Sequence, residues 1–266
     1  MADKSSNTES AALYERRGCT AIITLNRPQA LNAVNADLST AVGMLLERAE
    51  SDGDVRVIVL TGAGRAFCAG ADLKALGSGA STDAEGHPEW GFAGYVQHWV
   101  SKPTIAAVNG FALGGGTELV LASDLAVADE HAQLGLPEVR RGLFAAAGGV
   151  IRMQQQVPTK VALELTLTGA PITAARAQEL GLVNRVAPAG TALQVALDLA
   201  SAIAVNAPLA VTTSKSMIHR TAHAPDWGPE AWGANAAAMQ VVFSSADAKE
   251  GAAAFAEKRQ PVWQGR

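Results

Sequence analysis

The first half of the chain contains several short apolar runs, and an amphipathic segment lies between the first two of them. Runs rich in β-branched and small apolar residues predict strands at residues 19–25, 55–60, 104–108, 125–128 and 133–134. Between the first two runs, apolar side chains recur at helical spacing, so residues 35–50 are expected to form a helix with Asn35 as a possible cap. This alternation indicates an α/β fold with substantial parallel pairing.

After Ala145 the pattern becomes that of Ala-rich helical segments separated by Pro or Gly. Helices are expected at residues 145–157, 159–167, 173–180, 190–206, 208–222, 228–244 and 246–258. We therefore expect three parts: a polar, disordered tail at 1–12, a core at 13–200, and a helical C-terminal region at 201–266.

Between the two patterns lies a small, polar stretch, residues 77–86, which is expected to be a mobile loop. An aromatic cluster follows it, made of Trp90, Phe92, Tyr95 and Trp99. The cluster is interpreted either as a helix that docks its apolar face or as a wall over a substrate pocket, because binding loops are drawn from mobile segments.

Charge and composition exclude several classes of protein. Lys and Arg total 21 against 25 Asp and Glu, and a net charge of −4 does not suit a dedicated nucleic-acid binder. Only two cysteines occur, which excludes a disulfide scaffold and a thiolate-rich metal site. The N-terminus lacks the apolar stretch of a secretory signal, and no segment is long enough to span a bilayer, so a cytoplasmic protein is expected.

Two glycine-containing turns each follow a predicted buried strand. One runs through residues 61–73 and the other through 109–119. Glycines allow the backbone to approach a ligand, and two N–H groups that converge on one point form an oxyanion hole. A dinucleotide site is disfavoured because Phe67 stands where the third glycine is needed, and neither a P-loop nor a nucleophile elbow occurs.

Two carboxylates stand at turns into predicted helices. Glu118 follows three glycines in an apolar segment, and Glu138 follows Gly135-Leu136-Pro137. A pair of carboxyl groups that faced each other in an apolar setting would have separated pKa values and would supply an acid and a base. The alternative for each residue is favourable placement at a helix N-terminus, since the spacing alone does not show that they meet.

Other reactive side chains favour simpler interpretations. His219 and His223 have helical spacing but no third ligand in the sequence, and we expect both to be exposed to solvent. Cys68 lies between Phe67 and Ala69 with no neighbouring base, so it is expected to be a small buried residue. No metal site is expected.

Several motifs together carry a resemblance to a known family. They are Leu25-Asn26-Arg27-Pro28, Phe67-Cys68-Ala69-Gly70-Ala71-Asp72-Leu73, Ala106-Ala107-Val108-Asn109-Gly110, Gly114-Gly115-Gly116-Thr117-Glu118-Leu119, Gly135-Leu136-Pro137-Glu138-Val139 and Phe255-x-Glu257-Lys258-Arg259-x-Pro261. Over residues 13–266 the sequence resembles the enoyl-CoA hydratase/isomerase (crotonase) family. The resemblance implies a spiral of ββα units, a helical C-terminal region that forms homotrimers or homohexamers, and an acyl-CoA thioester substrate.

The resemblance also implies roles for particular residues. The amides of Ala71 and Gly115 would form the oxyanion hole, and Glu118 and Glu138 correspond to the two carboxylates of family hydratases. The implied substrate-binding residues are Ala69, Ala71, Asp72, Leu73, Lys74, Gly114 and Gly115. The chain departs from the family pattern at Phe144-Ala145-Ala146-Ala147, beside the acyl pocket of relatives, which bears on substrate shape more than on reaction type.

Retention of both carboxylates favours an enoyl-CoA hydratase, which adds water across the C2=C3 bond of a trans-2-enoyl-CoA. An enoyl-CoA isomerase or another acyl-CoA lyase is the alternative enzyme, and a non-catalytic acyl-CoA-binding protein is the alternative of another class. No separate cofactor is expected, because coenzyme A is part of the substrate, and neither nucleic acid nor membrane is an expected partner.

Overall fold

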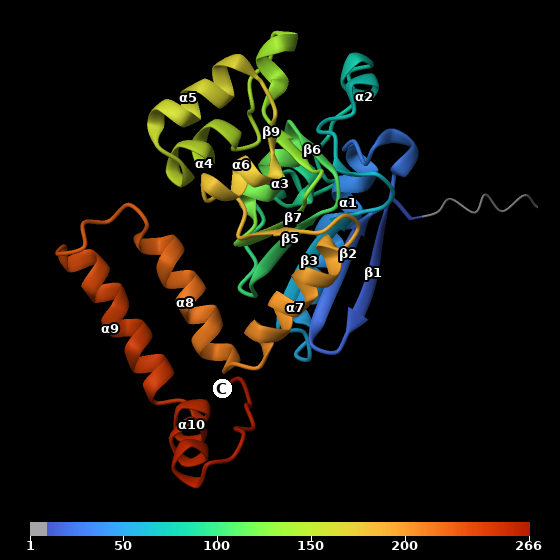
Figure 1. Ribbon diagram of the computed structural model, residues 1–266. Helices are drawn as coiled ribbons and strands as arrows, with labels where there is room; N and C mark the ends of the chain where they lie inside the picture. The colour runs from blue at the N-terminus through green and yellow to red at the C-terminus, as the bar shows by residue number, and fades with distance from the viewer. Residues whose placement is uncertain (1–9) are drawn as a thin grey trace, which may run out of the picture.

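Two β-sheets packed against helices form the body of the protein, and the C-terminal helices project from it (Figure 1). The computed structural model describes residues 10–266. The larger sheet has the strand order β1-β2-β3-β5-β7-β10, in which β1 runs antiparallel to β2 and all other neighbours are parallel. Its strands are β1 Ala12–Arg17, β2 Thr20–Leu25, β3 Val57–Gly62, β5 Thr104–Val108, β7 Leu125–Asp129 and β10 Arg185–Ala187.

The smaller sheet has the order β4-β6-β8-β9, with only the last pair antiparallel. Its strands are β4 Ala66–Cys68, β6 Phe111–Leu113, β8 Gln133–Gly135 and β9 Ile172–Thr173. Each of β3, β5 and β7 in the larger sheet is followed in the chain by its counterpart β4, β6 or β8 in the smaller one. A helical segment comes next each time: α2 Leu73–Gly77, α3 Gly115–Ala122 or the 3₁₀ turn η4 Pro137–Arg141. This repetition confirms the predicted spiral of ββα units.

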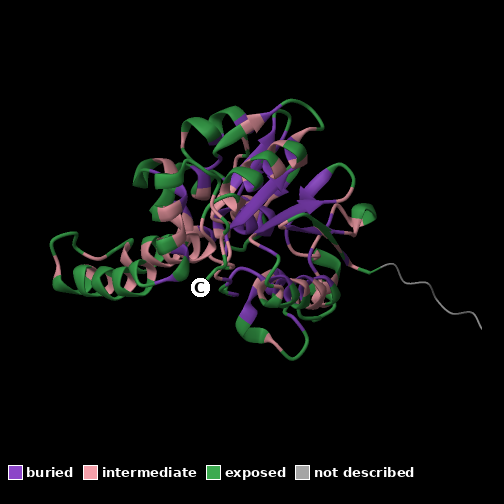
Figure 2. Ribbon diagram, turned by 90° about the horizontal axis from the view of Figure 1, so that it is seen from below, coloured by how far each residue is buried: buried purple, intermediate pink, exposed green. Residues whose placement is uncertain are grey.

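The two faces of the larger sheet are covered by different helices. Along β3, Val57 and Val59 pack toward α7, whereas Ile58 and Leu60 belong to the main core that α1 covers. This is the alternation of a strand buried on both faces. Figure 2 shows that most residues of the strands are buried.

The helices confirm the predicted pattern within a few residues at each end. Asn35 caps α1 through a hydrogen bond from the Leu38 N–H to its side-chain oxygen, at 3.1 Å. The longer helices are α1 Ala36–Ser51, α4 Gly149–Gln156, α5 Thr159–Thr168, α6 Ala174–Glu179, α7 Ala192–Ala204, α8 Pro208–Thr221, α9 Pro229–Phe243 and α10 Ala246–Glu257, and a 3₁₀ turn, η1, spans Pro28–Ala30. Strands β1, β4, β6, β9 and β10 were not predicted, because they are short or, in β1, mostly polar.

The aromatic cluster does not form the docked helix that was the first of its two interpretations. Trp90 and Phe92 lie on two 3₁₀ turns, η2 Pro88–Trp90 and η3 Phe92–Gly94, and Tyr95 and Trp99 follow them in the chain. Gly91 and Ala93 have φ values of 67° and 59°, and this left-handed backbone prevents a continuous helix. The Trp90 indole is stacked between the imidazoles of His87 and His98, with ring centroids 3.9 and 4.5 Å away.

The predicted division of the chain stays a prediction. Most of the expected tail lies outside the described residues, and Ala12, its last residue, is buried at the start of β1. The predicted boundary at residue 200 falls inside α7, whose Ala192, Ala196 and Ala200 pack on the larger sheet.

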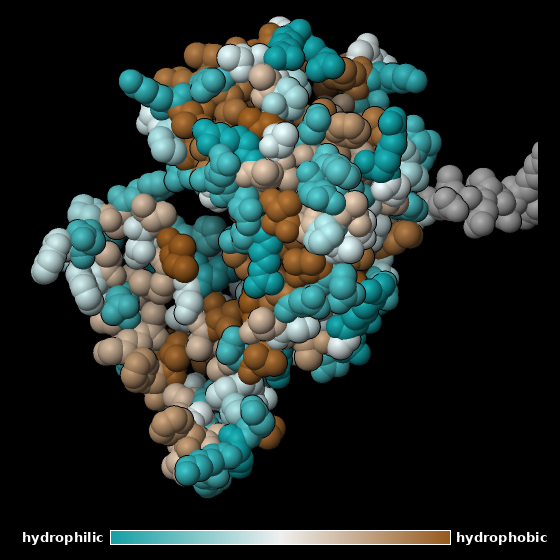
Figure 3. Space-filling model, viewed as in Figure 1, coloured by the Kyte–Doolittle hydropathy of each residue, from teal (hydrophilic) through white to brown (hydrophobic). Residues whose placement is uncertain are grey.

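Helices α8 and α9 form an exposed arm (Figure 1). Neither helix has a buried residue, and side chains such as Ile218, Trp232 and Phe243 are largely exposed. Figure 3 shows apolar side chains along the arm and a hollow between the arm and the body. Among the described residues no single helix is long and apolar enough to cross a bilayer, and α7 and α8 reach that length and hydropathy only together, across a bend of 108°.

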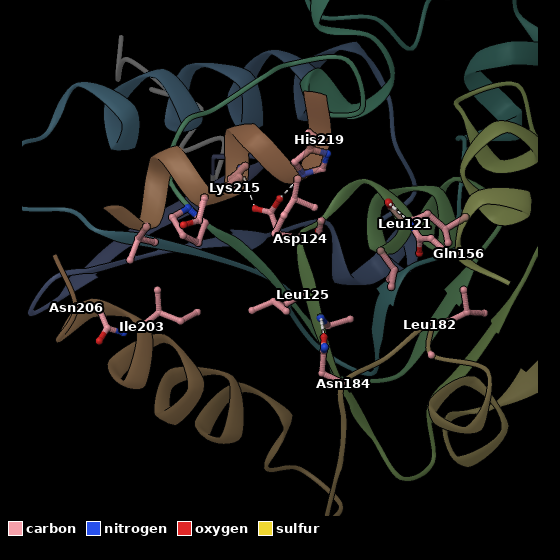
Figure 4. A pocket seen from close by; sticks show the side chains of 18 of the residues that line it. Leu121, Asp124, Leu125, Gln156, Leu182, Asn184, Ile203, Asn206, Lys215 and His219 are labelled. Atoms are coloured by element: carbon pink, nitrogen blue, oxygen red, sulfur yellow. Dashed lines mark hydrogen bonds and ion pairs between the residues drawn. The ribbon is translucent and has the colours of Figure 1, made fainter. Parts of the chain in front are cut away.

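One buried carboxylate ties the arm to the body. Asp124, which precedes β7, accepts hydrogen bonds from Lys215 Nζ at 2.8 Å and His219 Nε2 at 2.9 Å, both on α8 (Figure 4). Burial opposes ionisation of Asp124, but Lys215 and the hydrogen bonds outweigh it, so the pKa of Asp124 is lowered. The three side chains border a cavity of about 720 Å³ between α7, α8 and β7.

We expect Asp124→Asn to release α8 from the body. The Lys215 side chain is only 9% exposed, and removing one partner of a buried ion pair costs about 3–5 kcal/mol. Hydrogen–deuterium exchange should show faster exchange confined to α8 and the arm. Glu179→Gln, which breaks an exposed pair with Arg176, is the matched control. Unchanged exchange in α8 would show that the arm is held by other contacts.

Candidate functional site

Two neighbouring parallel strands of the smaller sheet bring their following loops together. Strand β4 leads into Ala69–Gly70–Ala71, and β6 leads into Gly114 and the N-terminus of α3. Gly70 has φ +96°, and a Cβ placed on it would lie 3.2 Å from the Gly115 nitrogen and 3.0 Å from the Leu113 carbonyl oxygen. Only glycine allows the two loops to approach this closely.

The backbone around this contact leaves two N–H groups free. Val34 pairs with the residues on either side of Ala71, because its N–H donates to the Gly70 carbonyl and its carbonyl accepts from Asp72 N–H. Gly115 is the first residue of α3, where a helix has no internal acceptor for its N–H. Within the described residues neither the Ala71 nor the Gly115 N–H donates a hydrogen bond, so both are free to bind an anionic oxygen.

Glu118 lies in the first turn of α3 and is almost completely buried. Its Oε1 accepts a hydrogen bond from the Gly149 N–H, at 2.8 Å, at the start of α4. Burial is the main cause that raises the pKa of Glu118, the Gly149 hydrogen bond lowers it and the Glu138 carboxylate raises it, and the resulting pKa is about 7. Close to neutral pH, the side chain can therefore accept and release a proton.

Glu138 comes from η4, the helical segment of the next ββα unit. Its Oε1 packs against Gly114, where a Cβ would lie 2.8 Å from it. Its Oε2 is buried and makes no hydrogen bond to any described residue. Burial raises the pKa of Glu138, and Arg141 opposes this. A buried carboxyl oxygen without a protein partner is suited to hold a reactant or a water molecule.

These groups share one cavity of about 720 Å³. Both carboxylates line it, together with Ala71 and Gly115. Its remaining walls come from the loops after β4 and β6, from residues 82–97, and from residues 137–147. Phe144, Ala146 and Ala147, from the segment where the chain departs from the family pattern, form part of the wall, and Phe144 is 63% exposed.

Most of the residues that the resemblance implied for substrate binding line this cavity. They are Ala69, Ala71, Leu73, Gly114 and Gly115. Asp72 and Lys74 are not among its lining residues. The Asp72 carboxylate caps α2 through the Lys74 and Ala75 N–H groups and pairs with Arg27 Nη2 at 3.0 Å, whereas Lys74 is exposed.

Three residues in or behind this site were not assigned to it as individual residues from the sequence. The Phe92 ring packs on Gly115, where a Cβ would come within 2.4 Å of it. Gly149 holds Glu118, and Arg152 lies one helical turn further along α4. Only Phe92 gave a signal in the sequence, as part of the aromatic cluster interpreted as a possible pocket wall.

Other candidate side chains are confirmed in their simpler interpretations. Cys68 is buried, and burial raises the pKa of its thiol to about 12, so it is not a thiolate nucleophile. His219 and His223 are exposed. Over residues 10–266, no group of three or more His, Cys, Asp or Glu side chains could hold a metal ion.

Comparison with known proteins gives the same family as the motifs. A model of the enoyl-CoA hydratase/isomerase family matches residues 15–266. Enoyl-CoA hydratase EchA19 of Mycobacterium tuberculosis is 42% identical, covering 96% of this chain and 97% of its own. Carnitinyl-CoA dehydratase of Proteus mirabilis is 40% identical, covering 94% and 97%.

A solved structure agrees with these sequence relatives. The crystal structure of carnitinyl-CoA hydratase from Mycobacterium avium is 55% identical, covers 97% of this chain and 100% of its own, and superposes with a TM-score of 0.78. The relatives are named as hydratases and dehydratases, which are hydro-lyases, and this chain is an enzyme of the same class. The motifs, the fold and the comparisons together place the chain in the enoyl-CoA hydratase/isomerase family.

Proposed function

We propose that the enzyme adds water reversibly across the C2=C3 bond of a trans-2-enoyl-CoA. The observation that carries the proposal is the shared cavity, in which the Glu118 and Glu138 carboxyl groups and the free N–H groups of Ala71 and Gly115 are found together. Acid–base groups beside paired amide donors suit a reaction that moves protons while negative charge develops on a thioester oxygen.

In this mechanism Glu118 acts as the base and Glu138 as the acid. A water oxygen forms a bond to C3, and the water gives one proton to the Glu118 carboxylate. The C2=C3 π bond breaks, its electrons pass toward the thioester, and the Glu138 carboxyl delivers a proton to C2. Exchange of protons with solvent then restores both residues, and the reverse sequence dehydrates a 3-hydroxyacyl-CoA.

The Ala71 and Gly115 N–H groups stabilise the thioester oxygen as it gains enolate character. Loss of one such donor typically lowers a rate by about 10²–10³-fold. Both donors belong to the backbone, and their separation is set by the contact of Gly70 with Gly115. We propose that coenzyme A enters as part of the substrate and that no separate cofactor takes part.

The exposed arm fits the homotrimer or homohexamer that the family resemblance implies. Apolar side chains such as Trp232 and Phe243 stand in water on a single chain, and large exposed apolar areas commonly mark interfaces. We propose that other copies of the chain cover the arm.

A second candidate reaction is dehydration of carnitinyl-CoA, favoured by the names of the Proteus mirabilis and Mycobacterium avium relatives. The same acid–base pair would serve, and the substrate would add a quaternary ammonium group. Asp83 brings a carboxylate to the cavity wall that could attract such a group. We expect turnover of both L-carnitinyl-CoA and crotonyl-CoA, with Asp83→Asn raising KM for the cationic substrate only. Equal KM changes for the two substrates would exclude this role for Asp83.

Glu118→Gln and Glu138→Gln should each lower kcat for crotonyl-CoA hydration by about 10²–10⁴-fold, because an amide cannot exchange the proton. The decrease in absorbance of the conjugated enoyl thioester measures the rate. Glu164→Gln removes the same charge from an exposed position on α5 and should keep the wild-type rate. If both site variants stay near the wild-type rate, the paired-carboxylate mechanism is wrong.

The raised pKa of Glu118 also predicts how stability depends on pH. A carboxyl with a pKa of about 7 in the folded state and an ordinary pKa when unfolded favours folding when protonated. Wild type should therefore lose stability, on the order of 3 kcal/mol, as pH rises from about 4.5 to about 7. Glu118→Gln lacks this loss.

Urea unfolding at pH 5 and pH 8 tests this expectation. The free energy of unfolding of Glu118→Gln minus that of wild type should increase from pH 5 to pH 8, because only wild type loses stability over this range. The comparison uses the change with pH, so a constant cost of the amide at this position does not affect it. A difference that stays constant would show that Glu118 does not have a raised pKa.

A further inference from the structure

A partly buried arginine, Arg152, lies near the Glu118 carboxylate, on the other side of the Gly148–Gly149 turn. Arg152 lies on α4, and its Nη2 donates a hydrogen bond to the Val96 carbonyl at 2.5 Å. Within residues 10–266 no carboxylate lies close enough to form an ion pair with it. Burial lowers the pKa of Arg152, and the charges of Tyr95 and Glu118 act in the opposite direction. A guanidinium that is desolvated without an ion-pair partner needs an explanation.

The guanidinium and the Glu118 carboxylate contact two consecutive glycines. A Cβ on Gly148 would come within 2.3 Å of Arg152 Nη1, so the guanidinium packs directly on that residue. A Cβ on Gly149 would lie 2.9 Å from Glu118 Oε1, and the Gly149 N–H donates to the same oxygen. Gly148 has φ +97° and precedes the first turn of α4, and the Arg152 N–H closes that turn on the Gly148 carbonyl at 2.8 Å.

Few other charged or titratable groups influence Glu118. Glu138 on η4 repels its negative charge, and Cys68 on β4 is close enough to be affected by it. The Cys68 thiol is neutral, and the Gly149 and Ala147 backbone provides dipoles only, whereas Arg152 is a cation that favours the ionised carboxylate. A second arginine, Arg141 on η4, lines the same cavity and lowers the pKa of Glu138.

We infer that Arg152 is a positioning residue for the proposed general base: through the Gly148–Gly149 turn it fixes the orientation of Glu118, and its positive charge favours the carboxylate form of that side chain. The inference rests on the proposed function only in naming Glu118 as the base. Arg152 does not line the substrate cavity, so it acts through Glu118 and not on the substrate.

The test is the pH profile of kcat/KM for crotonyl-CoA in wild type, Arg152→Gln and Arg152→Lys. Wild type should lose activity below about pH 7, where Glu118 becomes protonated. In Arg152→Gln this acidic limb should move up by roughly half a pH unit or more, so that activity at pH 6 falls about threefold beyond any loss at pH 9.

Arg152→Lys separates charge from packing, and a variant of an exposed arginine is the control. Arg152→Lys keeps the charge but loses the planar guanidinium that donates to the Val96 carbonyl. The acidic limb of its pH profile should therefore stay in place while kcat falls. Arg176→Gln removes an exposed arginine from α6 and should leave the profile unchanged. If Arg152→Gln lowers activity equally at every pH, the role of Arg152 is merely structural and the inference is overturned.

A spectroscopic readout is independent of turnover and of the folding of the arginine variants. In ¹⁵N NMR, the Arg152 Nε–H resonance of wild type should titrate with a midpoint near the pKa of Glu118, about 7, and this titration should be absent from Glu118→Gln. Glu138→Gln should retain the titration. A resonance that does not titrate in wild type overturns the inference even if the enzyme hydrates crotonyl-CoA. A titration in an enzyme without turnover would support it and contradict only the proposed function.

Discussion

The close approach of two backbone segments is the constraint on which the site depends. Because β4 and β6 are parallel neighbours, Gly70 and Gly115 meet with no room for a side chain between them. That contact orients Ala71 N–H and the first N–H of α3 without any polar side chain. Strand order, the two glycines and the start of α3 are therefore parts of one arrangement.

Burial of two carboxyl groups raises their pKa values at a cost in stability. Glu118 accepts a hydrogen bond from the Gly149 N–H and, within residues 10–266, has no ion-pair partner, and one oxygen of Glu138 has no partner among the same residues. Removal from water disfavours the charged forms, which brings their pKa values toward the range in which proton transfer to and from a substrate is efficient. The same desolvation supplies reactivity and lowers the stability of the fold at neutral pH.

The sequence was most informative where hydrophobic periodicity is strong. The buried strand Thr104–Val108 and the capped helix α1 were predicted closely, because continuous β-branched runs and helical spacing are local signals. Strands β4 and β6, with three residues each, were interpreted as turns, since their identity depends on pairing between distant segments. The aromatic cluster was not recognised as irregular backbone, because its side-chain pattern does not show that Gly91 and Ala93 have positive φ values.

The site could be predicted only in part from the sequence, because it too depends on contacts between segments that are distant in the chain. Motifs pointed to Glu118 and Glu138, but nothing local showed that the two acids border one cavity, and Asp72 proved to cap α2 and bind Arg27. Gly149 and Arg152 are ordinary residues in the sequence, and their positions follow only from the packing of α4 on α3.

The free N–H groups of Ala71 and Gly115 have a consequence for how such an enzyme diverges. Every amino acid except proline retains a backbone N–H, so exchange of the Ala71 side chain would leave its amide in place. The carboxylates, by contrast, are each lost by a single substitution. Under the proposed mechanism, a lineage built on this scaffold could exchange its acids and bases while the N–H groups that polarise the thioester are retained, so new reactions would arise first among those that pass through an enolate.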